Sequence, residues 1–501
     1  MAVAKVCGIE TEYGIIVRGD ANSNPIAASS TLVNAYVQGL GSEVGRPRST
    51  GWDFEDEHPD IDARGNVTRA TYAPEVEVHL VNAVLTNGSR YYVDHAHPEL
   101  STPECLTARQ ALLYDRAGEE ILLASMAAAP QWLEAGHEIV VYKNNSDGKG
   151  QSYGCHENYL ISRSLPFGTL ARHATTHLVT RSIFCGAGKV GAESPHGPVT
   201  PATFQITQRA DFFEEEVGLE TTLKRPIINT RDEPHADPKK YRRLHVIIGD
   251  ANMSEVATFL KLGTTALWLA AVEDDAAGEP IRFANPVEAF RDISRDLSLE
   301  MPIELDNGKR MTALEIQWEL LGRCARYGET HGLDAVGEEE GHLILDRWEL
   351  VLNGLESDPV RLADQIDWIA KYRLIEGYRD RHQLNWNDAK LKAMDLQYHD
   401  LRPERSLARR VGLETLCSEE DVRAAIVEPP PDTRAWFRGA CLQRFGDQVD
   451  AANWDSLVFD VGGDSLQRVP MLEPTKGTRS QLGHLFVDCD SAAELLKRLN
   501  S

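Results

Sequence analysis

Val6-Cys7-Gly8-Ile9-Glu10-Thr11-Glu12-Tyr13-Gly14-Ile15-Ile16-Val17 is the stretch from which the fold of this chain is predicted. Apolar and polar residues alternate along it, which is typical of a β-strand with one face on a core. Glu10 and Glu12 therefore point to the same face. Two carboxylates one pleat repeat apart offer hard oxygen ligands to Mg²⁺, although such pairs are more often plain surface charge.

A second polar strand follows. The sequence Asn87-Gly88-Ser89-Arg90-Tyr91-Tyr92-Val93-Asp94 is typical of a turn that leads into a short strand. Arg90, Tyr92 and Asp94 alternate and share one face, and Glu99 and Thr102 come soon after. Because buried charges need partners, this density predicts either a ligand-binding face or an ordinary salt-bridged strand and turn.

Histidines and a basic cluster add further candidates. His156 and His245 could complete a metal shell or contact phosphate, although single histidines are usually structural. The densest basic cluster of this acidic chain suits a phosphate or an acidic substrate, and consists of Lys239, Lys240, Arg242 and Arg243.

A glycine string at Gly186-Ala187-Gly188-Lys189-Val190-Gly191 has the spacing of a dinucleotide-binding loop. Such a loop joins a strand to a helix, whereas prolines at 195 and 198 block a helix here. No GxxxxGK[ST] motif is present either. Any nucleotide must therefore be held by a different architecture.

The composition limits the class of protein. The chain has 501 residues, 52 Lys and Arg against 77 Asp and Glu, and a formal net charge of -25. This balance argues against broad nucleic-acid or anionic-membrane binding. No run reaches the roughly 18 apolar residues that span a bilayer, and acidic residues stand where a signal peptide would be apolar, so we expect a cytoplasmic protein. The eight cysteines contain no CxxC pair, which predicts buried free thiols, and Cys155 is interpreted as a packing residue rather than a nucleophile.

The pattern along the chain predicts a long polar loop and a late boundary. Residues 41–77 have the composition of a flexible loop, and loops of this length are usually functional lids or disordered segments. The proline cluster at 428–432 ends a helical region and predicts a small domain after it. Other predicted elements are helices at 29–40, 104–128 and over most of 310–426, and strands at 139–143 and 159–163.

Several longer blocks add up to a resemblance. They are Gly8-Ile9-Glu10-Thr11-Glu12-Tyr13-Gly14, Asn87-Gly88-Ser89-Arg90 through Glu104-Cys105, Lys143-Asn144-Asn145-Ser146-Asp147, Ser152-Tyr153-Gly154-Cys155-His156-Glu157-Asn158-Tyr159, Arg225-Pro226-Ile227-Ile228-Asn229-Thr230-Arg231-Asp232-Glu233-Pro234-His235-Ala236-Asp237 and Tyr241 through Glu255. Together they resemble the Pup ligase/depupylase family over nearly the whole chain.

The resemblance implies an α+β fold: a large glutamine synthetase-like domain with a curved, mostly antiparallel sheet flanked by helices, and a small C-terminal domain. We expect the catalytic domain at 1–428, with 41–77 as a flexible insertion loop near the active site, and the small domain at 432–501. The family's ligases lack such an insertion, and Asp94-His95-Ala96-His97-Pro98-Glu99 departs from their Asp-Val-Gly-Ser-His-Pro-Glu. We therefore favour the depupylase branch.

The resemblance also implies a set of functional residues, a reaction and its partners. Metal ligands for Mg²⁺ are expected at Glu10, Tyr92 and Glu99, with Glu12, His156 and His245 as further candidates. Contacts to ATP are expected at Arg90, Thr102 and Trp454, and Asp94 is the expected catalytic carboxylate, either as a general base or as a nucleophile.

The implied activity is deamidation of the C-terminal glutamine of the small modifier Pup and cleavage of Pup from lysines of pupylated proteins, with ATP as a bound cofactor. Two alternatives remain: a Pup–protein ligase that acts through an acyl phosphate, and a non-catalytic Pup-binding protein. Pup is expected to be an acidic, largely disordered chain, so we expect it to bind through a few basic residues, with Arg242, Arg243 and the neighbouring lysines as candidates.

Overall fold

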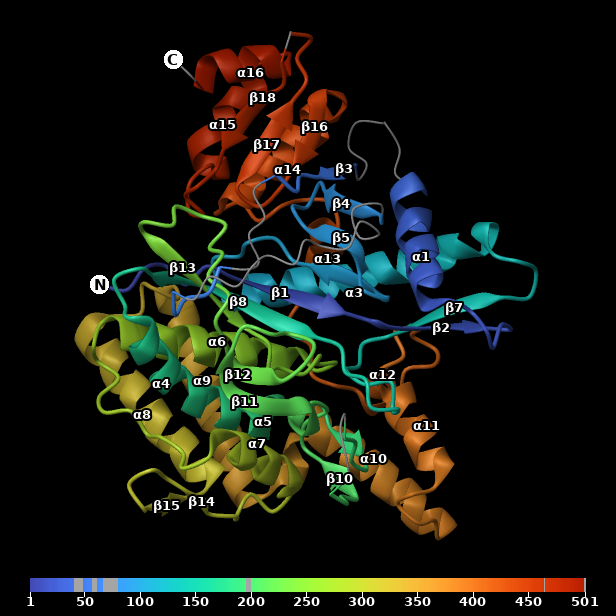
Figure 1. Cartoon of the computed structure of the whole chain (residues 1–501), viewed down its shortest axis with the longest axis vertical. Coiled ribbons are helices and arrows are strands. Elements are labelled where there is room, and N and C mark those ends of the chain that lie inside the picture. Colours follow the sequence, from blue (N-terminus) through green and yellow to red (C-terminus); the bar gives the residue numbers. More distant parts are fainter. Residues whose placement is uncertain (40–47, 56–60, 66–79, 195–199, 464, 500–501) are drawn as a thin grey trace.

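The structure is a computed structural model that describes residues 1–39, 48–55, 61–65, 80–194, 200–463 and 465–499 (Figure 1). Its centre is a ten-stranded sheet in the order β13-β8-β1-β6-β5-β4-β3-β16-β17-β18. Every neighbouring pair is antiparallel except β3 and β16. The strands are β1 (Cys7–Glu12), β3 (Ser49–Trp52), β4 (Asn82–Leu85), β5 (Arg90–Asp94), β6 (His97–Ser101), β8 (Cys155–Ser162), β13 (Tyr241–Val246), β16 (Val449–Ala452), β17 (Ser456–Phe459) and β18 (Gln467–Pro470).

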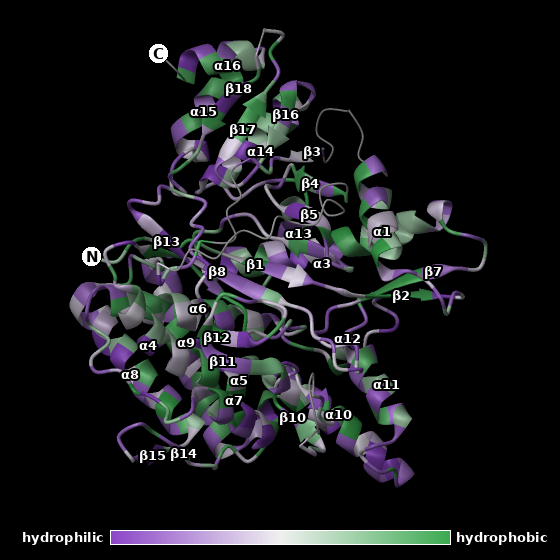
Figure 2. Ribbon diagram, in the orientation of Figure 1, coloured by the Kyte–Doolittle hydropathy of each residue, from purple (hydrophilic) through white to green (hydrophobic). Residues whose placement is uncertain are grey.

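The first strand forms as its alternation predicts. Cys7, Ile9 and Thr11 are buried, whereas Glu10 and Glu12 lie on the other, partly open face. A second ribbon, β2 (Gly14–Arg18) with β7 (Glu138–Tyr142), leaves the large sheet and packs beside α1 (Pro25–Gly39). Figure 2 shows both strands of this ribbon as largely hydrophobic.

Helices cover the buried face of the sheet. The helix α3 (Ala108–Ala128) packs on β1 and β7, and α6 (Glu255–Glu273) packs on β8. Among the described residues, α6 is the one helix that is long and apolar enough to cross a bilayer, and its most apolar window is entirely buried inside the protein. The predicted α+β class with a mostly antiparallel sheet flanked by helices is confirmed.

The remaining elements surround this core. The longer helices are α4 (Phe167–Thr180), α7 (Pro286–Arg295), α8 (Ala313–His331), α9 (Glu338–Ser357), α10 (Asp367–His382), α11 (Ala389–Tyr398), α14 (Arg434–Phe445) and α15 (Arg479–Asp488). The short helices and turns are α5 (Ser182–Cys185), α12 (Leu407–Val411), α13 (Glu419–Ala425), α16 (Ala492–Leu499), η1 (Ala129–Trp132), η2 (Ala210–Phe212), η3 (Pro359–Leu362) and η4 (Gly446–Gln448). Short strand pairs are β9 (Lys189–Val190) with β10 (Phe204–Gln205), β11 (Phe213–Gly218) with β12 (Arg225–Asn229), and β14 (Ile303–Glu304) with β15 (Arg310–Met311).

The C-terminal elements stack on one end of the sheet (Figure 1). They enclose an apolar core of their own, to which Trp52 and Val84 of the preceding strands also belong. Because β16, β17 and β18 continue the ten-stranded sheet, the two parts share one backbone hydrogen-bond network. The domain boundary at 428–432 therefore stays a prediction.

Part of the insertion is a strand rather than a loop. Ser49–Trp52 pairs with β4 on one side and with β16 on the other. The prediction of irregular structure is wrong for these four residues, because pairing with a segment 400 positions later in the chain cannot be seen in local composition. Residues 41–47, 56–60 and 66–77 lie outside the described residues.

The structure agrees with the predictions for the cysteines and for the glycine string. The eight cysteines are free, and all but Cys417 are buried. Burial raises the pKa of the Cys155 thiol, which agrees with a packing role. The glycine string follows α5 and contains the two-residue strand β9, so it does not join a strand to a helix.

Candidate functional site

Five adjacent strands bring the predicted residues to the open face of the sheet. The register places Glu10 opposite both Ser101 and His156, and Glu12 opposite Glu99. In turn, Tyr92 lies opposite Glu99. Since directly opposed residues of antiparallel strands point to the same face, carboxylates, imidazoles and a phenol from β5, β6, β1, β8 and β13 meet in one layer.

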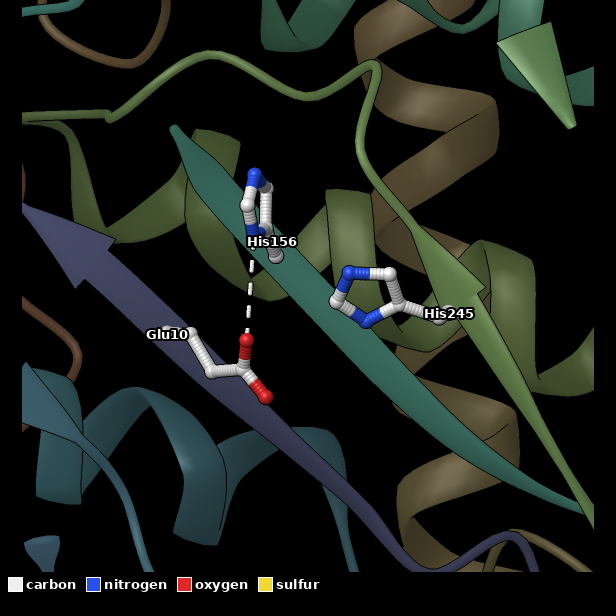
Figure 3. Close-up of side chains that lie close together, drawn as sticks. All are labelled: Glu10, His156 and His245. Carbon is white, nitrogen blue, oxygen red and sulfur yellow. Dashed lines mark ion pairs between the residues drawn. The ribbon is translucent and has the colours of Figure 1, made fainter. Parts of the chain in front are cut away.

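The first group in this layer consists of Glu10, His156 and His245, which come from three neighbouring strands (Figure 3). One potential ligand atom of each lies within 4.8 Å of the others. The Nδ1 atom of His156 is 3.6 Å from Glu10 Oε2, and the two imidazole rings meet edge to face with centroids 5.0 Å apart. The geometry can hold one metal ion between a carboxylate and two imidazoles.

The second group consists of Glu12, Asp94 and Glu99, whose nearest oxygens also lie within 4.8 Å of one another. Glu99 is buried, whereas Glu12 and Asp94 are partly exposed. Gly154 lies where the two groups meet, because a Cβ atom at this position would be 2.3 Å from His156 Nε2 and 2.7 Å from Glu12 Oε1. The absence of a side chain at Gly154 therefore permits the close approach of the groups.

The charged side chains of the two groups alter one another's pKa. Burial raises the pKa of Glu99 well above its ordinary value, and the negative charges of Asp94, Glu12 and Glu10 raise it further. Burial would also raise the pKa of Glu10, but the hydrogen bond with His156 and the charges of His245 and Arg243 hold it well below the ordinary value. A cation between the carboxylates would relieve their mutual repulsion.

Asp94 ends β5 and borders a tight turn. The next residue, His95, has a φ of 50°, and its Nδ1 lies 2.6 Å from Asp94 Oδ2. Burial would raise the pKa of Asp94, but the hydrogen bond with His95 and the charges of His95, His156 and Arg90 lower it. The Asp94 carboxylate is therefore ionised at neutral pH and adjoins the second group.

Arg90 and Tyr92 form a stacked pair on β5. The guanidinium carbon of Arg90 is 4.1 Å from the Tyr92 ring centroid, and its Nε donates to Asn82 Oδ1 at 2.9 Å. The Tyr92 hydroxyl is 3.4 Å from Ser101 Oγ, and burial together with the charge of Glu99 raises the pKa of the phenol well above its ordinary value. That Tyr92 binds a metal stays a prediction.

A pocket opens at the Gly8 end of β1 and reaches the C-terminal elements. Its lining includes Glu10, Thr102 and Trp454, so two of the three expected ATP contacts share one cavity with a metal-ligand candidate. Thr102 Oγ1 accepts a hydrogen bond from the amide of Ile9 at 3.0 Å. His235 and Arg434 also line the pocket and were not predicted.

Sequence reasoning missed Asn158, which links Glu10 to Arg243 within this layer. Asn158 Nδ2 donates to Glu10 Oε1 at 2.7 Å, and Asn158 Oδ1 accepts from Arg243 Nη1 at 2.7 Å. The spacing of His156 and Asn158, two apart on one strand, is the signal that could have found the amide.

The predicted basic cluster divides between two sides of the sheet. Arg243 lies in the layer, 3.8 Å from Glu10 Oε1, whereas the buried Arg242 is 3.6 Å from Asp232 Oδ1 and donates to the carbonyl of Leu165. Lys240 pairs with Glu473. Arg242 and Arg243 therefore do not face the same side of the sheet, because neighbouring residues of a strand point to opposite faces. That this cluster binds Pup stays a prediction.

The donor set fits the cofactors that the resemblance implies. Clustered carboxylates are the ligands that Mg²⁺ prefers, and the raised pKa of Glu99 marks a site where a counter-charge is favourable. The pocket beside Glu10 combines a hydroxyl, an indole and two guanidinium groups, which suits a nucleotide.

The chain matches the Pup-ligase protein family over residues 5–458. It is 52% identical to the depupylase of Acidothermus cellulolyticus and 45% identical to the Pup deamidase/depupylase of Mycolicibacterium smegmatis, in each case over 99% of this chain and 99% or more of the relative. A Pup–protein ligase of Kineococcus radiotolerans is 43% identical over 72% of this chain and 79% of its own length.

Solved structures of the Pup ligase PafA are also similar. A complex of PafA with Pup matches 97% of this chain and 92% of that one, with a TM-score of 0.79 and 31% identity. PafA in complex with ADP matches 80% of this chain and 89% of that one, with a TM-score of 0.73 and 36% identity. The sequence match that spans most of the chain, together with the similarity to PafA, places this protein in the Pup-ligase protein family.

Proposed function

We propose that this protein is a Pup deamidase and depupylase that works with bound ATP and Mg²⁺. The observation that carries the proposal is the identity of 45% or more over 99% of the chain to proteins named depupylase or Pup deamidase/depupylase. Two Pup–protein ligases are 43% and 42% identical to this protein, in each case over 72% of the chain. Mg²⁺ and ATP are supported by the donor set and by the PafA–ADP complex.

The proposed reaction is hydrolysis of a γ-glutamyl amide. The carboxamide of a C-terminal glutamine and the isopeptide to a lysine are the same functional group and differ only in the amine that leaves. Water supplies a hydroxyl to the γ-carbonyl carbon, and ammonia or the lysine amine departs with a proton. One site can therefore act on both substrates.

Asp94 is the proposed catalytic carboxylate. Its lowered pKa keeps it ionised, which both the general-base and the nucleophilic role require. As a base it would accept a proton from the attacking water, and as a nucleophile it would form a transient anhydride that water then opens. His95 holds the Asp94 carboxylate in place through its Nδ1 atom.

The two groups of ligands are the proposed metal-binding residues. Glu10, with His156 and His245, and Glu99, with Glu12, would hold Mg²⁺, and Tyr92 is a further candidate ligand. When bound, Mg²⁺ polarises oxygen ligands and stabilises developing negative charge. Arg90, Thr102 and Trp454 would bind ATP. Arg243 of β13 donates to Asn158 on the neighbouring strand and lies 3.8 Å from Glu10 Oε1.

A direct test uses purified full-length protein with Mg²⁺ and ATP. Glutamine-ended Pup and a Pup–lysine conjugate are supplied separately, and mass spectrometry follows the terminal residue and the released protein. Conversion of glutamine to glutamate and release of intact target protein support the proposal. If glutamate-ended Pup is instead joined to lysines and no conjugate is cleaved, the protein is a ligase.

A further inference from the structure

The described part of the insertion brings an aromatic side chain to the nucleotide end of the site. Trp52, the last residue of β3, is 6% exposed. The guanidinium carbon of Arg90 lies 3.8 Å from the Trp52 ring centroid and 4.1 Å from the Tyr92 ring centroid. The Arg90 guanidinium is therefore held by two aromatic rings, one of which the insertion supplies.

Trp52 also contacts the C-terminal part of the chain. Its ring meets that of Trp454 edge to face, with centroids 5.4 Å apart. Trp454 lines the pocket that contains Thr102 and Glu10, and the Arg438 guanidinium lies 5.2 Å from the Trp454 ring centroid. Trp52 thus touches both Arg90 and Trp454, which lie far apart in the sequence.

The strand β3 fixes Trp52 in this place. Gly51 and Trp52 pair with β16, and the amide of Asp53 donates to the carbonyl of Ala452 at 2.9 Å. Asp53 also forms an ion pair of 2.5 Å with Arg468 of β18. These contacts tie the insertion to the C-terminal elements and hold the indole against Arg90.

We propose that Trp52 is a positioning residue of the nucleotide site, which orients Arg90 and supports Trp454. The proposal rests on the proposed function for the identity of the ligand as ATP and for the roles of Arg90 and Trp454. An arginine that is already held in its binding geometry loses less conformational entropy when it contacts a phosphate. Stacking on aromatic faces restrains a guanidinium without competing for its N–H donors.

The test measures binding of Mg²⁺–ATP to the full chain by calorimetry. Loss of the ring in Trp52→Ala is expected to weaken ATP binding by about tenfold, the equivalent of one or two cation–π contacts. Trp52→Phe keeps an aromatic face and is expected to bind within about threefold of the wild type. At saturating ATP, kcat for Pup deamidation in Trp52→Ala is expected to stay within about twofold of the wild type.

A matched control and a double-mutant cycle separate positioning from folding. Thr50→Val removes the hydrogen bonds from Thr50 Oγ1 to the carbonyls of Val449 and Asp450, but leaves the Trp52 ring, and should bind ATP as the wild type does. If Trp52 acts through Arg90, the effect of Trp52→Ala on ATP affinity shrinks in an Arg90→Ala background.

Unchanged ATP affinity in Trp52→Ala would overturn the proposal. It would also be overturned if Trp52→Phe and Thr50→Val lost as much ATP affinity as Trp52→Ala does. Full additivity in the cycle with Arg90→Ala would overturn it as well. Because ATP binding is measured without Pup, failure of the proposed reaction and failure of the Trp52 role give different results: a chain that binds ATP through Trp52 but does not deamidate Pup refutes only the reaction.

Discussion

Glu99 of β6 lies directly opposite Glu12 of β1 in the antiparallel sheet. Two carboxylates thus face each other across neighbouring strands, with Asp94 beside them. Such an arrangement is unfavourable while all three are ionised. Burial raises the pKa of Glu99, and the charges of its neighbours raise it further. We therefore expect that a divalent cation, if it binds at this site, displaces a proton.

We predict that Mg²⁺ binding releases a proton from Glu99 and tightens as pH rises. The raised pKa means that the metal-free site holds the proton at pH values below that pKa, and Mg²⁺ must displace it. Calorimetry in two buffers of different ionisation enthalpy should show net proton release when Mg²⁺ binds. In Glu99→Gln this release should disappear and Mg²⁺ binding should weaken. Proton-independent binding over roughly pH 5–8 would contradict the prediction.

The second prediction concerns Gly154. An alanine Cβ would collide with His156 Nε2 and Glu12 Oε1, so both side chains must move away from their metal-binding positions. We expect Gly154→Ala to weaken Mg²⁺ binding by about 10–100-fold, as displacement of supporting groups does at other metal sites. Gly377→Ala is the matched control, because nothing lies within 4 Å of its added Cβ. Equal Mg²⁺ affinity in both variants would show that the two groups of ligands need not approach closely.

The third prediction concerns Asp94. Asp94→Asn keeps the size of the side chain but removes the charge, so it can neither accept a proton nor attack the amide. We expect Pup deamidation to fall by about 10²–10⁴-fold, while ATP binding stays close to that of the wild type. Rates of ammonia release and ATP titrations on the same preparation check both parts. Wild-type turnover in this variant would remove Asp94 from the mechanism.

The fourth prediction concerns the joint between the two parts of the chain. Glu104 pairs with Arg434 at 2.6 Å and with Arg438 at 2.5 Å, and both arginine side chains are almost fully buried. Glu104→Gln removes the negative charge that both buried arginines share. We therefore expect the free energy of unfolding to fall by about 3 kcal/mol. Glu473→Gln, which breaks the contact with the exposed Lys240, should cost less than about 1 kcal/mol.

The same joint gives a pH dependence with a defined sign. Burial would raise the pKa of Glu104, but Arg438 and Arg434 lower it to about 2 from 4.5. A lowered folded-state pKa means that the stabilisation is present above about pH 4.5 and is lost as pH falls towards 2. Denaturant unfolding at a series of pH values should show this loss in the wild type but not in Glu104→Gln. A parallel decline in both proteins would assign it to other carboxylates.

The sequence predicts those parts of the site that depend on the alternation of side chains along a single strand. The strand period of two places Glu10 with Glu12, and Arg90 with Tyr92 and Asp94, on single faces. The meeting of these strands with His156 and His245 depends on register between distant segments, which local patterns do not contain. The same period would have separated Arg242 from Arg243, but the basic cluster was interpreted from composition alone.

Strand β3 shows the other limit of local patterns. Ser49-Thr50-Gly51-Trp52 lies in a polar stretch with loop-like composition, and it forms a strand because β4 and β16 supply its hydrogen-bond partners. Trp52 was consequently overlooked as part of the site. Resemblance to a family supplied the roles of Thr102 and Trp454, since neither residue stands in a pattern that predicts nucleotide binding.

The ratio of ammonia released to ADP formed tests the central claim most directly. Purified protein is mixed with Mg²⁺, ATP and glutamine-ended Pup, and both products are measured over many turnovers. Hydrolysis of an amide in water is favourable without energy input, so the proposed hydrolase releases ammonia repeatedly while ADP does not rise in step with it. Stoichiometric ADP formation with attachment of Pup to lysines, or no ammonia at all, would contradict the assignment.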